Sequence, residues 1–320
     1  MIRRWSGALV AGVLGLGLAL HPVTATAVAG PANLYAWDAF SSSTCAKSMT
    51  GAGPKGGPVP ADGTWRTVQL DRRGRVASSS ITARSVVSGR LTNDSRGSSR
   101  LSLRISSSST ARPTSSSSCP VTYILESGVG GADVIISKPS WFVVRSTLSA
   151  SGLRSGYLRL FSTTDSRRWT AQPGGARTEL VSRGQYILDT LLKSSIKVPS
   201  RSTAARSARA SLSASLSLFP IGTLRSRQGG GLAYVTVGHR DCTYDRARLV
   251  LLDRASSEAR RITVDVDGRR RLDLSGAELD RSGYLLSGIN PRSGGVIRAT
   301  VATRSGGTVT MQAVTWPCSA

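Results

Sequence analysis

Apolar and polar residues alternate with a period of two along much of the chain. Leu101, Leu103 and Ile105 are separated by Ser and Arg, and the run from Leu212 to Leu218 alternates leucine or alanine with serine. Because successive side chains of a strand point to opposite faces, this period predicts strands with one buried and one solvent-facing side. A helical period over three turns is not seen. The pattern therefore predicts an all-β protein.

Turn-forming residues separate the predicted strands at short intervals. Asp267-Gly268 stands between the alternating runs Ile262–Val266 and Leu272–Leu274. This dipeptide favours the type I′ turn of a two-residue hairpin. We expect another hairpin over residues 67–76. Many short strands with frequent turns are typical of antiparallel β-sandwiches.

Four cysteines follow the N-terminal segment, at Cys45, Cys119, Cys242 and Cys318. The first two are 74 residues apart and the last two are 76 residues apart. Two nearly equal loops suggest that one structural unit occurs twice, so we predict the disulfides Cys45–Cys119 and Cys242–Cys318. None of the four has the close spacing of metal ligands, and we expect neither a metal nor a cofactor.

The order of strands and glycine-marked segments recurs three times along the chain, which suggests an internal repeat. We therefore expect three tandem antiparallel β-sandwich modules over residues 28–127, 128–225 and 226–320, the middle one without cysteine. The stretch Tyr157–Leu188 contains a strand, Trp169, a Gly-Gly turn, a second strand and a Gly-x-Tyr sequence. It resembles bacterial immunoglobulin-like modules. This resemblance implies an Ig-like architecture and no functional residue.

The first residues have the pattern of an export signal. Arg3 and Arg4 precede the apolar run Ser6–Leu20, and Ala25–Ala27 forms a small-x-small cleavage sequence. We predict a signal peptide over residues 1–27. Cleavage two residues later and export by the twin-arginine route stay open. The protein is expected to be secreted or associated with the cell envelope, without a membrane anchor after cleavage.

The chain is strongly basic, with a formal net charge of +24, and five of its 42 basic residues are lysine. One interpretation is a charged surface that keeps an exported β-protein soluble. The other is attraction to an anionic cell-wall or extracellular polysaccharide. Nucleic acid is not an expected partner of an exported protein. The middle segment has the largest excess of positive charge, and we expect its polyanion contacts at Arg154, Arg159, Arg167, Arg168, Arg201, Arg206 and Arg209.

Candidates for catalysis are few. His239 is the one histidine after the predicted signal peptide, and Asp241 is the acid nearest to it in that segment. These two residues define the alternative of a secreted hydrolase or lyase, because triads and acid–base pairs are recognised by geometry and not by sequence order. We favour a protein without catalytic activity.

Tryptophan provides a third hypothesis. Five tryptophans follow the signal peptide: Trp37, Trp65, Trp141, Trp169 and Trp316. Exposed indole rings on a sandwich would stack on sugars and make the chain a carbohydrate-binding protein. Each lies in or beside a predicted strand, so we favour core packing. The sequence leaves the ligand and the oligomeric state open.

Overall fold

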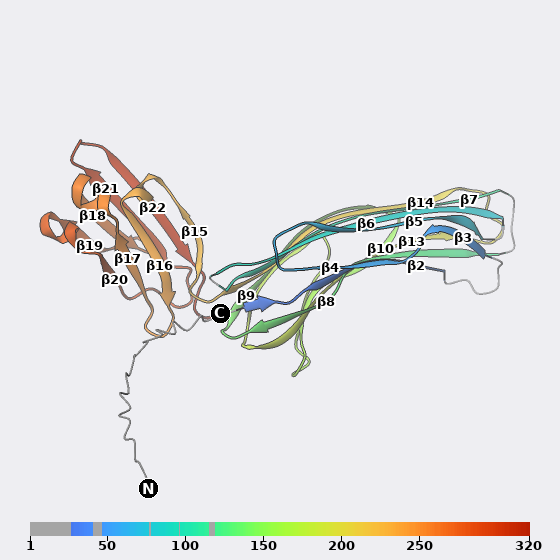
Figure 1. Cartoon of the computed structure of the whole chain (residues 1–320), viewed down its shortest axis with the longest axis horizontal. Coiled ribbons are helices and arrows are strands. Elements are labelled where there is room, and N and C mark those ends of the chain that lie inside the picture. The colour runs from blue at the N-terminus through green and yellow to red at the C-terminus, as the bar shows by residue number, and fades with distance from the viewer. Residues whose placement is uncertain (1–26, 41–46, 77, 96, 115–118) are drawn as a thin grey trace, which may run out of the picture.

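The computed structural model places the chain in two β-rich bodies, a long sandwich and a smaller one beside its end (Figure 1). The structure describes residues 27–40, 47–76, 78–95, 97–114 and 119–320. All strand pairs in these residues are antiparallel, which confirms the predicted all-β sandwich class. The predicted signal peptide ends at the first described residue, and Cys45, with its predicted bridge to Cys119, lies outside the described residues. In the described residues, no helix is long and apolar enough to cross a membrane.

The larger body consists of two sheets that face each other. Within the described residues, sheet A contains, from edge to edge, β11 (Arg168–Ala171), β10 (Leu153–Ser162), β13 (Gly184–Val198), β8 (Val121–Ile136), β2 (Ala32–Phe40) and β4 (Lys55–Val59), with β1 (Ala27–Ala29) also on β8. Sheet B contains β12 (Ala176–Val181), β9 (Ser140–Ser151), β14 (Arg206–Pro220), β7 (Ser99–Pro113), β6 (Ser79–Asn93), β5 (Arg66–Val76) and β3 (Lys47–Ala52).

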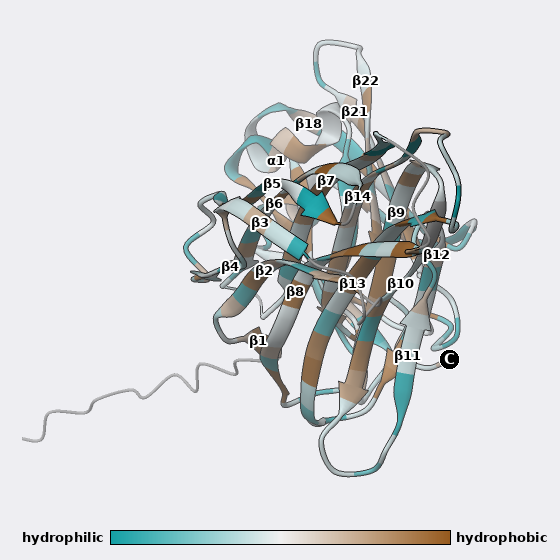
Figure 2. Ribbon diagram, turned by 90° about the vertical axis from the view of Figure 1, so that its right-hand side faces the viewer, coloured by the Kyte–Doolittle hydropathy of each residue, from teal (hydrophilic) through white to brown (hydrophobic). Residues whose placement is uncertain are grey.

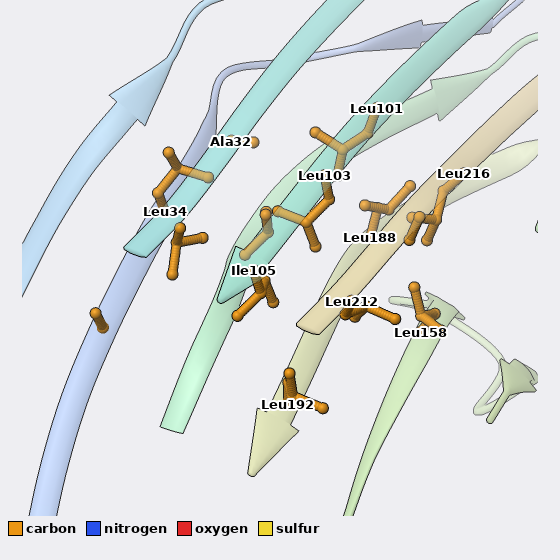
Figure 3. Packing of buried hydrophobic residues seen from close by; sticks show 14 of the residues in the cluster. Ala32, Leu34, Leu101, Leu103, Ile105, Leu158, Leu188, Leu192, Leu212 and Leu216 are labelled. Carbon is orange, nitrogen blue, oxygen red and sulfur yellow. The ribbon is translucent and has the colours of Figure 1, made fainter. Parts of the chain in front are cut away.

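The apolar side chains of both sheets meet in one core. Every second residue of β7 and β14 is buried, as the alternation of the sequence predicts, and Figure 2 shows the same alternation along the strands. Figure 3 shows the side chains of Leu103 and Ile105 of β7 and of Leu188 and Leu192 of β13 between the two sheets, in one buried cluster. One cluster of buried residues extends from Ala27 to Leu218. Full burial of a leucine, isoleucine, valine or phenylalanine side chain in this cluster stabilises the fold by about 1.5–3 kcal/mol.

Serine replaces leucine at several inward positions of this core. The buried hydroxyl oxygens of Ser85, on β6, and Ser127, on β8, are 2.6 Å apart and share a hydrogen bond between the sheets. Ser107 and Ser194 form a second such pair. Buried hydroxyls are tolerated when they find partners, so these pairs let the sheets approach without a large apolar side chain between them.

The expected division of residues 28–225 into two modules is wrong. The proposed boundary between residues 127 and 128 falls inside β8, and β14 pairs with β7 from Arg206–Ala111 to Leu218–Ser99. Strands from both expected modules therefore share sheets and a core. The physical reason is that strands of 15 residues extend about 50 Å and can bury their apolar faces only against a second sheet of similar length.

The predicted hairpin over residues 67–76 is also wrong, because β5 continues through it without a turn. Gly74 serves a different purpose there. A side chain on Gly74 would place its Cβ 2.1 Å from the carbonyl oxygen of Ser48 on β3. Glycine is required for the close approach of the two strands, and not for a bend.

The smaller body begins close to the expected boundary at residue 226. In the described chain its sheet C is ordered β15 (Leu224–Gln228), β22 (Thr308–Thr315), β21 (Val296–Thr303), β18 (Ala259–Val266) and β19 (Arg269–Ser275), and its sheet D is ordered β16 (Val235–Asp241), β17 (Arg246–Leu251) and β20 (Gly283–Leu286). Helix α1 (Asp253–Glu258) and the 3₁₀ helices η1 (Gly230–Ala233) and η2 (Gly276–Asp280) connect the strands. These elements surround a separate apolar core.

Two sequence predictions for this body are confirmed. β18 and β19 form the expected hairpin, and both Asp267 and Gly268 have positive φ, as a type I′ turn requires. Cys242 and Cys318 form a disulfide with their Cα atoms 5.4 Å apart. Because Cys242 follows β16 and Cys318 follows β22, the bridge ties the C-terminal segment to the start of the body.

The two bodies are joined by a short turn and a stack of aromatic rings. Trp316 stacks on Phe219 at the end of β14, with ring centroids 5.0 Å apart, and on Trp141 of β9 at 6.1 Å. The indole nitrogen of Trp141 donates to the carbonyl oxygen of Pro317 at 2.8 Å. Gly222, with φ of +73°, lies in the turn, where a Cβ would be 2.4 Å from the carbonyl oxygen of Arg240. These contacts fix the end of β14 against β22.

A buried arginine organises the smaller body beside this turn. The Arg240 side chain is fully buried, and its guanidinium donates to the Asp245 carboxylate at 2.8 Å and to the carbonyl oxygens of Ile289 and Ser293. Its backbone N–H donates to Gly222 in the linking turn. Removal of a buried charge with several hydrogen bonds strongly destabilises the folded state, because its partners are left without a donor.

Replacing Ile105 with alanine should destabilise the whole larger body. We expect Ile105→Ala to lower the free energy of unfolding by about 2–5 kcal/mol, because it opens a cavity in the shared core. Hydrogen exchange should quicken in strands on both sides of residue 128. Ser106→Ala, on the outer face of the same strand, should change stability by about 0.5 kcal/mol or less. Faster exchange confined to residues before 128 would contradict a shared core.

Replacing Arg240 with alanine should destabilise the smaller body by about 2–4 kcal/mol, because Asp245 and two backbone carbonyls lose their charged donor. Arg248→Ala, at an exposed position on β17, is the matched control and should be nearly neutral. Denaturant unfolding of the full chain measures both. Equal effects of the two substitutions would refute the structural importance of the buried arginine.

Candidate functional site: a groove lined by arginine and serine

The outer face of sheet B presents a line of small polar side chains along its central strand. Leu212, Leu216 and Leu218 of β14 point into the core, so the residues between them point outward. These outward positions are Ser207, Arg209, Ser211, Ser213, Ser215 and Ser217, of which Ser217 is buried and accepts a hydrogen bond from Arg100. Strand β14 lies between β7 and β9, whose outward residues include long arginine side chains. Small residues in the middle and long ones at the flanks form a groove along β14.

The strand register shows how residues distant in sequence meet on this face. Ser215 of β14 is paired with Ser102 of β7 and with Arg145 of β9, and Ser102 is paired with Arg90 of β6. One row across four strands therefore reads Arg, Ser, Ser, Arg. With strands about 4.8 Å apart, the Cα atoms of the two arginines are about 14 Å apart. This distance leaves room for a chain-like ligand above the two serines.

Three adjoining hollows follow β14. Their volumes are about 380, 370 and 210 Å³ in order from Arg209 toward Phe219. The last two share Arg145 and Ser215 in their walls. The first lies next to them along β14, because its wall includes Ser211 and the wall of the second includes Ser213, the next outward residue. From residue 209 to residue 217 the strand rises about 26 Å. We call this row of three hollows, lined by β6, β7, β9, β14 and β15, the Arg–Ser groove.

All charged side chains that line the Arg–Ser groove are positive. In the part of the chain that the structure describes, they are Arg90, Arg100, Arg104, Arg145, Arg209 and Arg225, and neither Asp nor Glu lines any of the three hollows. None of the six forms an ion pair with a described carboxylate. Concentrated charge of one sign in a concave surface attracts a counter-charged ligand.

Aromatic rings hold several of these arginines. Trp65, in the segment directly before β5, lies under the guanidinium groups of Arg90 and Arg104, at 5.3 and 4.8 Å from the ring centroid. Arg225 of β15 lies over Trp316 at 5.1 Å. Such cation–π contacts attract a guanidinium to the ring and restrict its rotation. The donors are therefore partly ordered without a carboxylate that would cancel their charge.

Most of the arginines expected from the sequence to bind a polyanion lie elsewhere. Arg209 lines the groove. Arg159, on the outer face of sheet A, is paired with Asp189, and Arg167 is paired with Asp165. Arg168, Arg201 and Arg206 are exposed and line none of the three hollows. The side chain of Arg154 lies outside the described part of the structure.

The sequence contained a signal for some of the missed arginines. The alternation around Leu101–Ile105 already places Ser102 and Arg104 on one solvent-facing side of a strand. It does not show that Arg145, some forty residues later, lies two strands away on the same face. The order of strands in sheet B, which decides this, comes from the tertiary structure.

The tryptophans divide between surface and interior. Trp37 and Trp65 are exposed, with 44% and 36% of their surface accessible to solvent. Trp316 is buried at the junction, Trp141 is half-buried beside it, and Trp169 packs edge-on against Tyr186. The expectation that the tryptophans pack in the interior therefore holds for Trp141, Trp169 and Trp316 and not for Trp37 and Trp65.

The weak catalytic candidates lie in the smaller body. His239 is exposed on β16. The Asp241 carboxylate accepts hydrogen bonds from the backbone N–H of Thr243 at 3.0 Å and from the Arg246 guanidinium at 3.4 Å, so it stabilises the turn between β16 and β17. Neither residue lines the Arg–Ser groove.

Comparisons with known proteins give little further information. No family model and no curated protein matches the chain. Among solved structures, the adhesin domain of Epf from Streptococcus pyogenes aligns with 87% of this chain and 88% of its own, at 10% identity and with a TM-score of 0.18. A TM-score this low supports no transfer of fold or function.

Proposed function

We propose that this chain is an exported, non-catalytic binding protein whose Arg–Ser groove holds a linear anionic polysaccharide. The observation that carries the proposal is the set of six groove arginines without a described carboxylate partner. Elsewhere on the molecule arginines such as Arg159, Arg254 and Arg261 are paired with acids. Arginines such as Arg168, Arg201 and Arg206 also have no ion pair with a described carboxylate, but they line none of the three hollows, whereas the six groove arginines lie around one row of hollows.

The floor of the groove suits a sugar polymer. Serine hydroxyls both donate and accept hydrogen bonds, as the hydroxyls of a sugar do, and they lie in a line along β14. Arginine forks bind carboxylate, sulfate or phosphate groups through two N–H donors at once. A polymer that alternates hydroxyls and anionic groups would match both sets. The signal peptide expected at residues 1–27 would bring the protein to such polymers outside the cytoplasm.

Removing two groove arginines should weaken polymer binding. We expect Arg104→Gln together with Arg145→Gln to reduce the affinity for dextran sulfate by about tenfold or more, because each loses a charged hydrogen-bond donor. Binding of both proteins should also weaken with added salt, since the contacts are exposed and screened. Isothermal titration calorimetry at two ionic strengths measures both effects.

The matched control changes the same charge outside the groove. Arg168→Gln together with Arg201→Gln removes two exposed arginines and should lower the affinity by less than about threefold. If the two double variants lose affinity equally, net charge and not the groove governs binding. If neither wild type nor variants bind a polyanion at low salt, the proposed function is refuted.

A second candidate function arises on the opposite face of the sandwich. Tyr35, Leu191 and Tyr157 lie in one row across sheet A. Trp37, whose ring is exposed, follows Tyr35 by two residues on β2 and so lies on the same face. Two ion pairs neutralise charges on this face: Lys193 with Glu126 at 3.0 Å and Arg159 with Asp189. Aromatic rings with paired charges favour stacking on a neutral sugar.

The tyrosines of this aromatic face remain protonated donors. Burial, with a contribution from the nearby Asp189 carboxylate, raises the pKa of Tyr35 above its ordinary value. Its hydroxyl donates to the carbonyl oxygen of Thr190 at 3.1 Å. Burial and a hydrogen bond to Asp189 likewise raise the pKa of Tyr157. Their rings are therefore held in place and uncharged at neutral pH.

Replacing Trp37 with alanine tests the second candidate. If the aromatic face binds neutral glycans, Trp37→Ala should abolish binding on a neutral-glycan array, and wild-type binding should be nearly unchanged by salt. Trp65→Ala, in the Arg–Ser groove, is the control and should keep neutral-glycan binding. Failure of the wild type to bind any neutral glycan would dismiss the candidate.

A further inference from the structure

The Arg–Ser groove ends in a hollow at the junction of the two bodies. Its volume is about 210 Å³, and it is more enclosed than the other two hollows. Arg100 of β7 and Arg145 of β9 come from the larger body, whereas Arg225 of β15 comes from the smaller one. We propose that this junction hollow is a specific subsite for a tetrahedral oxyanion, namely a sulfate or phosphate ester group carried by the polysaccharide. The inference rests on the function proposed above and names the chemistry of one part of its ligand.

The three guanidinium groups give the junction hollow a positive charge that no acidic side chain of its described lining balances and that a bound anion would neutralise. Within the described residues, no acidic side chain lines the hollow, and none of the three arginines forms an ion pair. Like charges brought together repel, and the repulsion is stronger beside a surface of low dielectric constant. Trp316 and Phe219 supply such a surface. A bound anionic ester group would place negative charge among the three guanidinium groups and convert repulsion into attraction.

Two of the three arginines are already held in place. The Nε of Arg100 donates to the hydroxyl of Ser217 at 3.2 Å, and the Arg225 guanidinium lies over the Trp316 ring. Trp316 is itself fixed by its stack on Phe219. Ligand binding therefore loses less side-chain entropy here than at freely rotating surface arginines. Ordered donors are what distinguishes a binding site from a diffuse basic surface.

The arrangement favours a tetrahedral group over a carboxylate. A carboxylate has two oxygens and is satisfied by one bidentate arginine. A sulfate or phosphate ester offers three terminal oxygens, which can accept hydrogen bonds from donors on three sides. Three arginines from three strands surround the hollow, so the match is to three oxygens. The volume also exceeds that of several water molecules, at about 30 Å³ each, and accommodates the ester group with part of its sugar.

The smaller body then takes part directly in recognition. Arg225 is on β15, at the edge of sheet C, and reaches the groove because the turn after β14 and the aromatic stack hold that edge beside β7 and β9. A substituted sugar in the junction hollow would contact both bodies at once. The subsite would fix the register of the polymer, while the serine-lined part of the groove holds the chain that follows.

The test uses the full chain and three small probes at matched ionic strength: inorganic sulfate, inorganic phosphate and glucuronate. Calorimetry should show saturable 1:1 binding of sulfate and phosphate, and at least about tenfold weaker binding of glucuronate. Arg225→Gln and Arg100→Gln should each weaken sulfate binding by about tenfold. Arg90→Gln, in the neighbouring hollow, should change it less than about twofold. Circular dichroism establishes that each variant is folded.

Arg225→Lys supplies a second readout, because it keeps the charge and removes the planar fork. We expect a sulfate affinity between those of the wild type and Arg225→Gln. The subsite is refuted if glucuronate binds as well as sulfate, or if Arg90→Gln is as harmful as Arg225→Gln. It is also refuted if dextran sulfate binds the protein while neither small oxyanion does, although the proposed function would stand. Saturable sulfate binding without any polymer binding would support the subsite and refute the polysaccharide function.

To separate the sources of the oxyanion, the protein is titrated with a sulfated and a phosphorylated monosaccharide. Tighter binding of the sulfated sugar identifies a sulfated polysaccharide, and the reverse identifies a phosphate-bearing one. Both results support a tetrahedral ester. Equal, weak binding of both, with no loss in Arg225→Gln, contradicts it.

Discussion

The burial of two long apolar sheet faces against each other is the interaction on which the rest of this protein depends. Strands such as β7 and β14 alternate inward apolar and outward polar side chains along 15 residues. A short local hairpin could not cover the inward apolar side chains of a strand of this length. Both sheets must form before either is stable, because an isolated sheet leaves its apolar face in water. The distant pairing of β14 with β7, and of β13 with β8, follows from that requirement.

The same alternation decides what the solvent meets. Each buried leucine on β14 implies an outward serine or arginine beside it, so a regular core creates a regular surface. The two outer faces nevertheless differ in chemistry. Sheet A combines aromatic rings with the acids Glu126 and Asp189, which pair with Lys193 and Arg159. Sheet B has its arginines around a serine floor without described acidic partners in the groove. The difference arises from where a few carboxylates are placed.

The junction converts two folded bodies into one functional surface. Trp316 belongs to the smaller body by sequence but stacks on Phe219 and Trp141 of the larger one. Aromatic pairs of this kind contribute about 0.5–1.5 kcal/mol to an interface in addition to the effect of the area that they bury. They bring Arg225 to the end of a groove that the larger body alone would leave open. The disulfide Cys242–Cys318 holds the segment that follows Trp316, so it supports the same arrangement.

The sequence by itself determined the local structure of this protein. Side-chain alternation identified the strands around Leu101–Ile105 and Leu212–Leu218, the Asp267-Gly268 dipeptide identified its hairpin, and cysteine spacing identified the bridge Cys242–Cys318. These features depend on neighbouring residues or on simple counting. The number of sandwiches and the groove were decided by the tertiary structure. A period of two tells which face of a strand is buried but not which strand lies beside it, and so Arg90, Arg145 and Arg225 could be gathered only by the folded sheets.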